Sequence, residues 1–341
     1  MNIQELYESI VKLTPYKADQ PDNYRKNLRE ALSEYQKLIS QLDDDRKPVG
    51  WDDIVLSIKK TIAKINVIAL NSYKGIPSTA GIQLGNLLKE LQDNILYKEI
   101  AADTSFYRMR TIEDRRTNIL HKEMFHIPMD MRRKVTTQRY STPGYPCLYL
   151  GMSVYTCWEE MNRPKMSDSW ASCLKNTRPL DLFDLSIPTS HFFQNNLEKY
   201  LKLFPLIISC MLPVENSKDI YKPEYIIPQL LTEWIIKNKK VGIFYTSIHK
   251  DSGFDFPADK YNNIAMPVQN PLKDKGYCDA LSTFFRISVP MNYEIELLRN
   301  GEGLDMDELG LDEERRREQN YSFSAFGHLE DWLQEGEFMN L

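Results

Sequence analysis

The chain has 341 residues, of which 42% are hydrophobic and 27% are charged, and its formal net charge is −5. This length can bury at least one core and suggests two structural units. The acidic balance gives no reason to expect nucleic acid as a partner. The sequence contains neither a run of 18 apolar residues nor an N-terminal apolar segment, so no membrane span and no cleaved signal peptide are expected. These features favour a cytoplasmic protein or export without a cleaved signal, and we predict a cytoplasmic protein with no membrane partner.

The cysteine and histidine patterns give no indication of a metal site. The five cysteines are widely spaced and form no C-x-x-C pair, so we predict reduced core thiols and neither a disulfide framework nor bound zinc. His121 and His126 do not have a recognised metal-binding spacing, and contact with solvent or phosphate is their predicted role.

Residues 1–102 are predicted to form a small all-helical module. Apolar residues recur at helical spacing in residues 24–42, 54–69 and 84–95. No catalytic pattern accompanies these apolar stripes. We therefore expect them to pack in a core or to mediate association.

Residues 103–299 have the pattern of an α+β domain, because short β-rich runs alternate with helical patterns. The predicted strands are residues 105–110, 146–150, 180–185, 241–246, 263–268 and 285–298, and the predicted helices are residues 153–161, 195–212 and 224–238. Residues 300–341 are predicted to be an acidic C-terminal tail with a short helix around residues 326–333.

Two arginines are the first candidates for a ligand site. Arg108 lies in a predicted strand and shares a face with Phe106 and Arg110. A guanidinium is costly to bury there without an anionic partner. Arg139 lies on a turn before the next predicted strand, and the planar fork of arginine suits a phosphate or pyrophosphate. A structural ion pair at a sheet edge would explain Arg108 equally well.

The helix predicted after Ser153 carries two adjacent glutamates, Glu159 and Glu160. Successive helical residues point about 100° apart, so at most one of the two should face a site. Glu160 flanks the apolar stripe of this helix, whereas Glu159 points nearly opposite to the stripe. We predict that Glu160 is the working carboxylate, with a solvated side chain as the alternative.

A serine and two tyrosines complete the candidate site. Ser247 follows a predicted strand, where its hydroxyl could bond a carboxylate or a ribose, and a turn residue is the alternative. Tyr140 is predicted to stack on nicotinamide or adenine. Tyr149 is a second candidate, although its apolar strand favours a place in the core. A phosphate-binding arginine and a placed carboxylate together indicate a site for a nucleotide whose ribose is attacked.

The ordered residues Arg108, Arg139, Glu160 and Ser247 resemble the RES domain, a family named for its Arg, Glu and Ser and related in fold to ADP-ribosyltransferases. The resemblance covers roughly residues 104–295. It implies a split sheet with a central cleft, in which Arg108, a catalytic candidate, and Arg139 would hold the phosphates or the nicotinamide ribose. Arg110, Tyr140 and Tyr149 are further candidate substrate contacts. Glu160 would bond the ribose and stabilise an oxocarbenium-like transition state, and Ser247 would position Glu160 or a ribose hydroxyl.

RES proteins are typically toxins that act on NAD, so the predicted activity is cleavage of the nicotinamide–ribose bond of NAD+ by hydrolysis or phosphorolysis. NAD+ is then the substrate, and no cofactor or metal is expected. The alternatives are a protein ADP-ribosyltransferase and a non-catalytic, nucleotide-sensing regulatory protein. The resemblance also makes a helix-turn-helix antitoxin or immunity protein a candidate partner, and self-association into a homo-oligomer is a further candidate.

Overall fold

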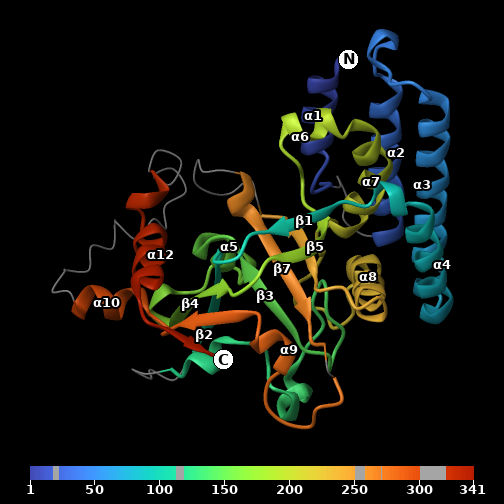
Figure 1. The fold of residues 1–341 in the computed structure, drawn as a ribbon. Coiled ribbons are helices and arrows are strands. Elements are labelled where there is room, and N and C mark those ends of the chain that lie inside the picture. The colour runs from blue at the N-terminus through green and yellow to red at the C-terminus, as the bar shows by residue number, and fades with distance from the viewer. Residues whose placement is uncertain (18–22, 113–118, 250–257, 270, 300–319) are drawn as a thin grey trace. The chain divides into compact units, whose positions relative to one another are not determined.

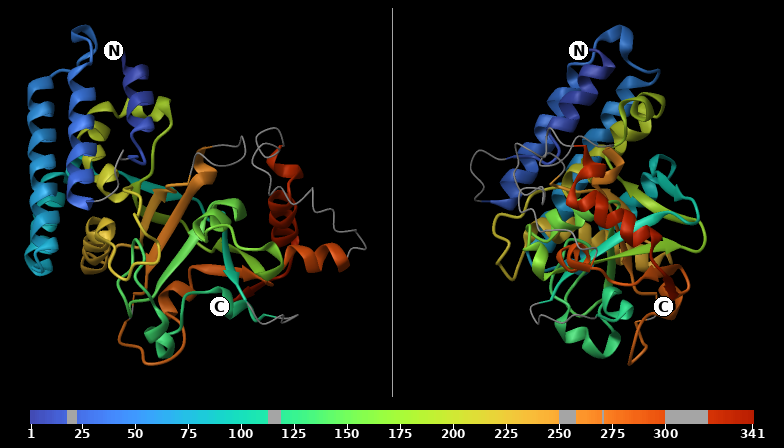
Figure 2. Two further views of the ribbon diagram at one scale, coloured as in Figure 1. Left: turned by 180° about the vertical axis from the view of Figure 1, so that it is seen from behind. Right: turned by 90° about the vertical axis from the view of Figure 1, so that its left-hand side faces the viewer.

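A computed structural model describes residues 1–17, 23–112, 119–249, 258–269, 271–299 and 320–341. The chain forms two units, each assembled from separated segments (Figures 1 and 2). Unit 1 comprises Met1–Tyr97, Thr136–Pro143 and Phe183–Lys240, and unit 2 comprises Lys98–Val135, Gly144–Leu182 and Val241–Leu341. The domains expected from the sequence are consecutive segments instead, and their boundaries stay a prediction.

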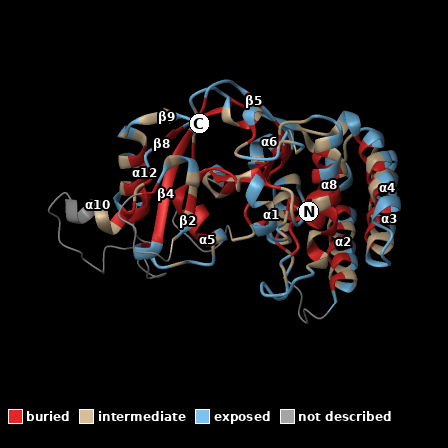
Figure 3. Cartoon of the chain, turned by 90° about the horizontal axis from the view of Figure 1, so that it is seen from below, coloured by how far each residue is buried: buried red, intermediate tan, exposed pale blue. Residues whose placement is uncertain are grey.

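Unit 1 is helical. Its α-helices are α1 (Ile3–Lys12), α2 (Tyr24–Ser40), α3 (Trp51–Tyr73), α4 (Pro77–Glu90), α6 (Ser190–Asn195), α7 (Leu197–Cys210) and α8 (Ile226–Lys237). The apolar stripes of the first helices cover helices that come much later in the chain, because α2 and α3 pack on α7 and α4 packs on α8. Helices α2, α3 and α4 each have one buried and one exposed face (Figure 3), whereas residues 203–210 of α7 are all buried. The helical N-terminal region is therefore confirmed.

Strands form one nine-stranded sheet with the order β1-β5-β6-β7-β3-β2-β4-β8-β9. Their bounds are β1 (Tyr97–Ile100), β2 (Ser105–Thr111), β3 (Cys147–Gly151), β4 (Ser169–Asn176), β5 (Leu180–Leu185), β6 (Ile243–Thr246), β7 (Asn262–Pro267), β8 (Phe285–Ser288) and β9 (Phe338–Asn340). Within the described residues, unit 2 adds the α-helices α5 (Val154–Glu160), α9 (Asp279–Ser282), α10 (Tyr293–Arg299) and α12 (Ala325–Glu335). The predicted α+β class is confirmed.

Alternation along β2 separates two cores in unit 2. Phe106 belongs to one hydrophobic cluster together with Leu174, its partner on β4. Tyr107 and its partner Cys173 belong to a second cluster, which contains the buried side chains of α5 and α12. Helix α5 therefore lies on the face of the sheet that Tyr107 occupies.

The pairing between β2 and β3 involves far fewer residues than the pairing of either strand with its other neighbour. These strands share a single antiparallel register pair, Tyr107 with Gly151. By contrast, β2 pairs with β4 along its whole length, and β3 does so with β7. Backbone groups of β3 are thus left beside β2 without a ladder partner on that strand.

The end of the chain is part of unit 2. The described residues 320–341 form η8 (Tyr321–Phe323), α12 and β9, and α12 packs on α5 and β4. The short helix expected around residues 326–333 lies within α12, whose Phe326, Leu329 and Leu333 are buried. The acidic residues 305–314 lie outside the described residues.

All five cysteines are free and buried, which confirms the predicted core thiols. Among the residues that the structure describes, no helix is both long enough and apolar enough to cross a membrane.

Tyr35 provides a test of the packing between early and late helices in unit 1. Its buried hydroxyl donates a 2.7 Å hydrogen bond to the backbone oxygen of Leu201 on α7. We expect Tyr35→Phe to lower the free energy of unfolding by about 1 kcal/mol, because one buried hydrogen bond is lost. The control Tyr73→Phe alters an exposed tyrosine of α3 and should leave the urea midpoint unchanged. Equal midpoints for both variants would contradict the prediction.

Candidate functional site

The turn from β3 into α5 positions the candidate carboxylate. A Cβ atom at Gly151 would lie 2.7 Å from Sγ of Cys157 and 3.1 Å from the backbone oxygen of Ser153. A larger residue at position 151 would have to displace the Cys157 side chain or the backbone of Ser153, so glycine suits this close approach. Ser153 caps the helix, since its hydroxyl accepts a 3.1 Å bond from the backbone N–H of Thr156.

Glu160, the last residue of α5, is exposed at its end. Its Oε1 atom accepts hydrogen bonds from Oγ of Ser247 at 2.7 Å and from Nδ2 of Asn263 at 2.8 Å. Both donors are buried, with 1% and 4% of their surfaces exposed. Two fixed donors thus orient a carboxylate whose other oxygen is not used by them.

The backbone fixes these donors in turn. The N–H of Ser247, just after β6, donates to the backbone oxygen of Tyr261 at 2.8 Å. Asn263 lies in β7, directly opposite Gly151 of β3 and Tyr245 of β6. The structure therefore brings Glu160 and Ser247 together and adds Asn263, which the sequence analysis placed only in a strand. A polar residue in an otherwise apolar run was the available signal, but the strand register was needed to interpret it.

The expected orientation of Glu159 is wrong. Its side chain is buried, accepts a bond from the hydroxyl of Tyr155 and pairs with Nε of Arg163 at 3.0 Å. Residues 154–159 are all buried, because α5 packs on β2, β3 and α12 rather than on the sheet alone. An apolar stripe therefore does not describe this helix, and only Glu160 reaches the surface.

Arg108 is a cation without a counter-ion in the described part of the chain. Its Nη1 atom donates to the backbone oxygen of Tyr149 at 2.8 Å, across the short β2–β3 contact. Its Nε atom is buried and has no hydrogen-bond partner. Burial, and secondarily the charge of Arg110, lower the pKa of Arg108 to about 10. The structural ion pair considered from the sequence is not formed among the described residues, and a bound anion would offset the cost of this burial.

Cys157 of α5 is a core thiol. Burial raises the pKa of this thiol to about 12, and its Sγ donates a 3.2 Å hydrogen bond to the backbone oxygen of Tyr107. The side chain of Arg110 donates to the backbone oxygen of Glu123, so its guanidinium also supports the fold.

The remaining candidates lie in different surroundings from those expected. Arg139 and Tyr140 belong to unit 1, where Nη1 of Arg139 donates to the backbone oxygens of Cys210 and Leu212 at 2.8 and 3.1 Å. Its guanidinium also lies over the ring of Tyr225, 5.1 Å from the centroid. Tyr140 is 1% exposed, so the prediction that it stacks on a ligand is corrected. Tyr149 is partly exposed.

The predicted role of His126 is also wrong. The ring is buried, Nδ1 bonds the backbone oxygen of Ile127 at 2.8 Å, and Nε2 accepts the N–H of Cys278 at 2.9 Å. Burial lowers its pKa to about 4, and the charge of Arg108 contributes to the lowering. The side chain is therefore a neutral part of the core. Within the described ranges, no group of three His, Cys, Asp or Glu side chains is arranged to hold a metal ion.

Comparison with known proteins finds a family resemblance over part of the chain. Residues 110–272 match the model of the RES domain, which confirms the predicted resemblance over that segment. The matched segment includes Arg139, Glu160, Ser247 and Asn263 and begins two residues after Arg108.

One relative extends beyond that segment. The chain is 32% identical over 305 residues to a protein of Bacillus subtilis (strain 168) named "Putative toxin YopC". The alignment covers 81% of this chain and 66% of that protein, so the chain spans slightly less than two thirds of the relative's length. No solved structure matches the chain at a significant level.

The difference in burial between Glu159 and Glu160 can be tested by measuring the free energy of unfolding of variants at each position. Glu159→Gln should lower the free energy of unfolding by about 1–3 kcal/mol, because it removes the charge that pairs with Arg163. Glu160→Gln is the matched control and should change stability by less than about 0.5 kcal/mol, since this side chain is exposed. Chemical denaturation of both variants measures the difference. A larger loss for Glu160→Gln would mean that their burial is assigned the wrong way round.

Proposed function

Since residues 110–272 carry a RES domain, we propose that the chain is a toxin-like enzyme that cleaves the nicotinamide–ribose bond of NAD+, by hydrolysis or phosphorolysis. The supporting observation is the exposed carboxylate of Glu160, held by the buried donors Ser247 and Asn263. The printed name of the Bacillus relative agrees with a toxic activity.

The proposed chemistry uses a fixed charge. Loss of nicotinamide from NAD+ leaves positive charge on the ribose, and an oriented carboxylate stabilises that charge more in the transition state than in the ground state. Glu160 carries this role, and its 2.7 and 2.8 Å hydrogen bonds hold Oε1 in place before substrate binds. Ser247 and Asn263 are then positioning residues, and no cofactor or metal takes part.

The arginines are proposed to bind the dinucleotide. Arg108 is the strongest candidate, because its side chain is partly exposed and no ion pair neutralises it within the described ranges, so its charge suits a phosphate oxygen. Arg139, Arg110 and Tyr149 are further proposed contacts. The single β2–β3 register pair supports an ADP-ribosyltransferase-like split sheet with a cleft. We further propose a cytoplasmic location and restraint by a helix-turn-helix antitoxin or immunity protein, with self-association as a second interaction.

Nicotinamide release from NAD+ by the purified protein tests the proposal directly. The reaction is followed with and without inorganic phosphate, which separates phosphorolysis from hydrolysis, and with mass analysis of the protein, which detects transferred ADP-ribose. Binding of NAD+ without any release would favour the nucleotide-sensing alternative. If the folded protein neither binds NAD+ nor releases nicotinamide, the proposal is overturned.

Glu160→Gln should reduce nicotinamide release by on the order of 10²-fold or more, because it removes the stabilising charge and keeps the shape. Ser247→Ala and Asn263→Ala should give smaller losses in kcat, since each removes one of two donors to Oε1. Glu335→Gln changes an exposed glutamate and is the control. Parental activity in Glu160→Gln would exclude this carboxylate from the chemistry.

Arg108→Lys should weaken binding of NAD+ or ADP-ribose by about tenfold, because lysine keeps the charge but loses the planar fork. Arg139→Lys should also weaken binding. Calorimetry in a Glu160→Gln background measures affinity without turnover. The control is Arg286→Lys, which alters an exposed arginine paired with Asp103. If Arg108→Lys and Arg139→Lys bind with the same affinity as this control, both arginines have a structural role alone.

A further inference from the structure

Helix α12 lies outside the segment that matches the RES domain, yet it packs on the helix that ends in Glu160. The ring of Phe326 is 5.3 Å from that of Tyr155 and 5.2 Å from that of Trp158, measured between centroids. These three rings form part of one buried cluster. The apolar contact fixes the distance between α12 and α5 but leaves the helix start to be fixed by polar groups.

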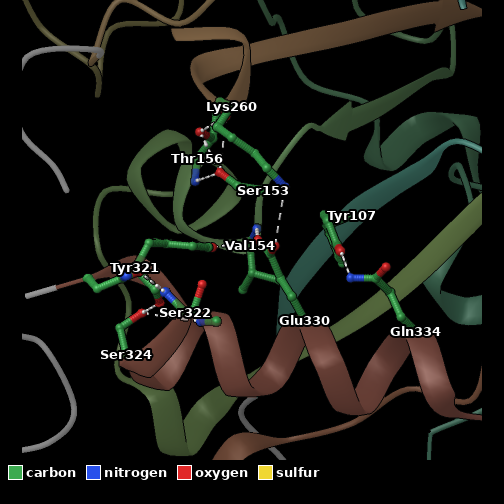
Figure 4. A network of polar contacts seen from close by, with 12 residues as sticks. Tyr107, Ser153, Val154, Thr156, Lys260, Tyr321, Ser322, Ser324, Glu330 and Gln334 are labelled. Atoms are coloured by element: carbon green, nitrogen blue, oxygen red, sulfur yellow. Dashed lines mark hydrogen bonds and ion pairs between the residues drawn. The ribbon is translucent and has the colours of Figure 1, made fainter. Parts of the chain in front are cut away.

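Glu330 of α12 supplies such a polar contact (Figure 4). Its Oε1 atom accepts the backbone N–H of Val154, the first residue of α5, at 2.7 Å, and the hydroxyl of Tyr321 donates to the same atom. Nζ of Lys260 lies 3.6 Å from Oε2. Glu330 is 4% exposed, so water cannot replace these partners easily.

A first-turn N–H has no acceptor within its own helix. At the start of α5 this group is buried, and a buried donor without an acceptor is costly. Glu330 therefore satisfies the N–H of the first residue of α5, beside the cap that Ser153 gives to Thr156. Since Glu160 lies six residues further along this short helix, a shift of the first turn moves the carboxylate away from its donors.

Lys260 extends the same network to those donors. Its backbone oxygen accepts the hydroxyl of Thr156 at 2.8 Å. The next backbone oxygen, that of Tyr261, accepts the N–H of Ser247 at 2.8 Å. The segment that contacts Glu330 thus holds both the first turn of α5 and the serine that binds Glu160.

We infer that Glu330 is a positioning residue for Glu160, acting through the first turn of α5 and through Lys260, so that the segment after the RES match completes the site. The inference rests on the proposed function for its kinetic consequence. Burial raises the pKa of Glu330, and Lys260, Tyr321 and Val154 act against that shift.

Four variants of α12 test the inference. Glu330→Ala removes the acceptor and should lower kcat for nicotinamide release by about tenfold or more, with KM changed less than about twofold, because a small displacement of a reacting group has a large effect on rate. Glu330→Gln keeps an oxygen for Val154 and should recover most of the rate. Glu330→Asp shortens the side chain by one methylene group, and its kcat should lie between those of Glu330→Ala and Glu330→Gln. Glu335→Ala, on the exposed side of α12, should match the parent.

Kinetics are measured well below the melting temperature on protein shown to be folded, so that stability alone does not change kcat. Parental kcat in folded Glu330→Ala would overturn the inference. If that variant does not fold, Glu330→Asp is used instead. A lowered kcat with unchanged KM in Glu330→Asp would support the inference, and a parental kcat would contradict it.

Amide exchange provides a readout that does not depend on activity. The N–H groups of Val154 and Ser247 should exchange faster in Glu330→Ala, or in Glu330→Asp if needed, than in Glu335→Ala. If the parent protein does not cleave NAD+, the proposed function fails, and exchange alone decides the positioning role. Unchanged exchange at both amides would then exclude it.

Discussion

The close approach of β3 and α5 at Gly151 is the constraint on which the candidate site depends. A Cβ atom there would lie 2.7 Å from Sγ of Cys157 and 3.1 Å from the backbone oxygen of Ser153. Because α5 packs on β2, β3 and α12, residues 154–159 are buried and Glu160 is the one exposed residue of this helix. A carboxylate at the end of a buried helix has few accessible positions. Stabilisation of a developing charge requires a group that is fixed in this way before the reaction.

The adjacent residues Glu159 and Glu160 therefore have different structural roles. Glu159 uses its charge inside the protein, with Arg163 and Tyr155 as partners. Glu160 uses one oxygen to bind Ser247 and Asn263 and presents its carboxylate at the surface. The first arrangement stabilises the fold, and the second places a negative charge where a ligand can reach it.

Arg108 carries a cost that the fold alone does not offset. Its guanidinium bonds a strand oxygen, but Nε has no partner and no ion pair forms in the described part of the chain. The side chain as a whole is partly exposed, but a buried donor without an acceptor is costly. In the proposed function, the phosphates of the dinucleotide supply the missing anion, so binding and the local stability of β2 are coupled.

Much of the site follows from local pattern. The sequence alone predicted the helical N-terminal region, the RES segment and the candidates Arg108, Glu160 and Ser247, of which the structure brings Glu160 and Ser247 together. These predictions depend on short motifs, helical periodicity and their order. Tertiary structure decided the burial of Glu159 and Tyr140, the second donor Asn263 and the contact of Glu330 with Val154. Each of these depends on a neighbour brought from a distant segment or a paired strand. Periodicity reports which face of an element is apolar but not which element will cover it, and that pairing is set by packing across the whole unit.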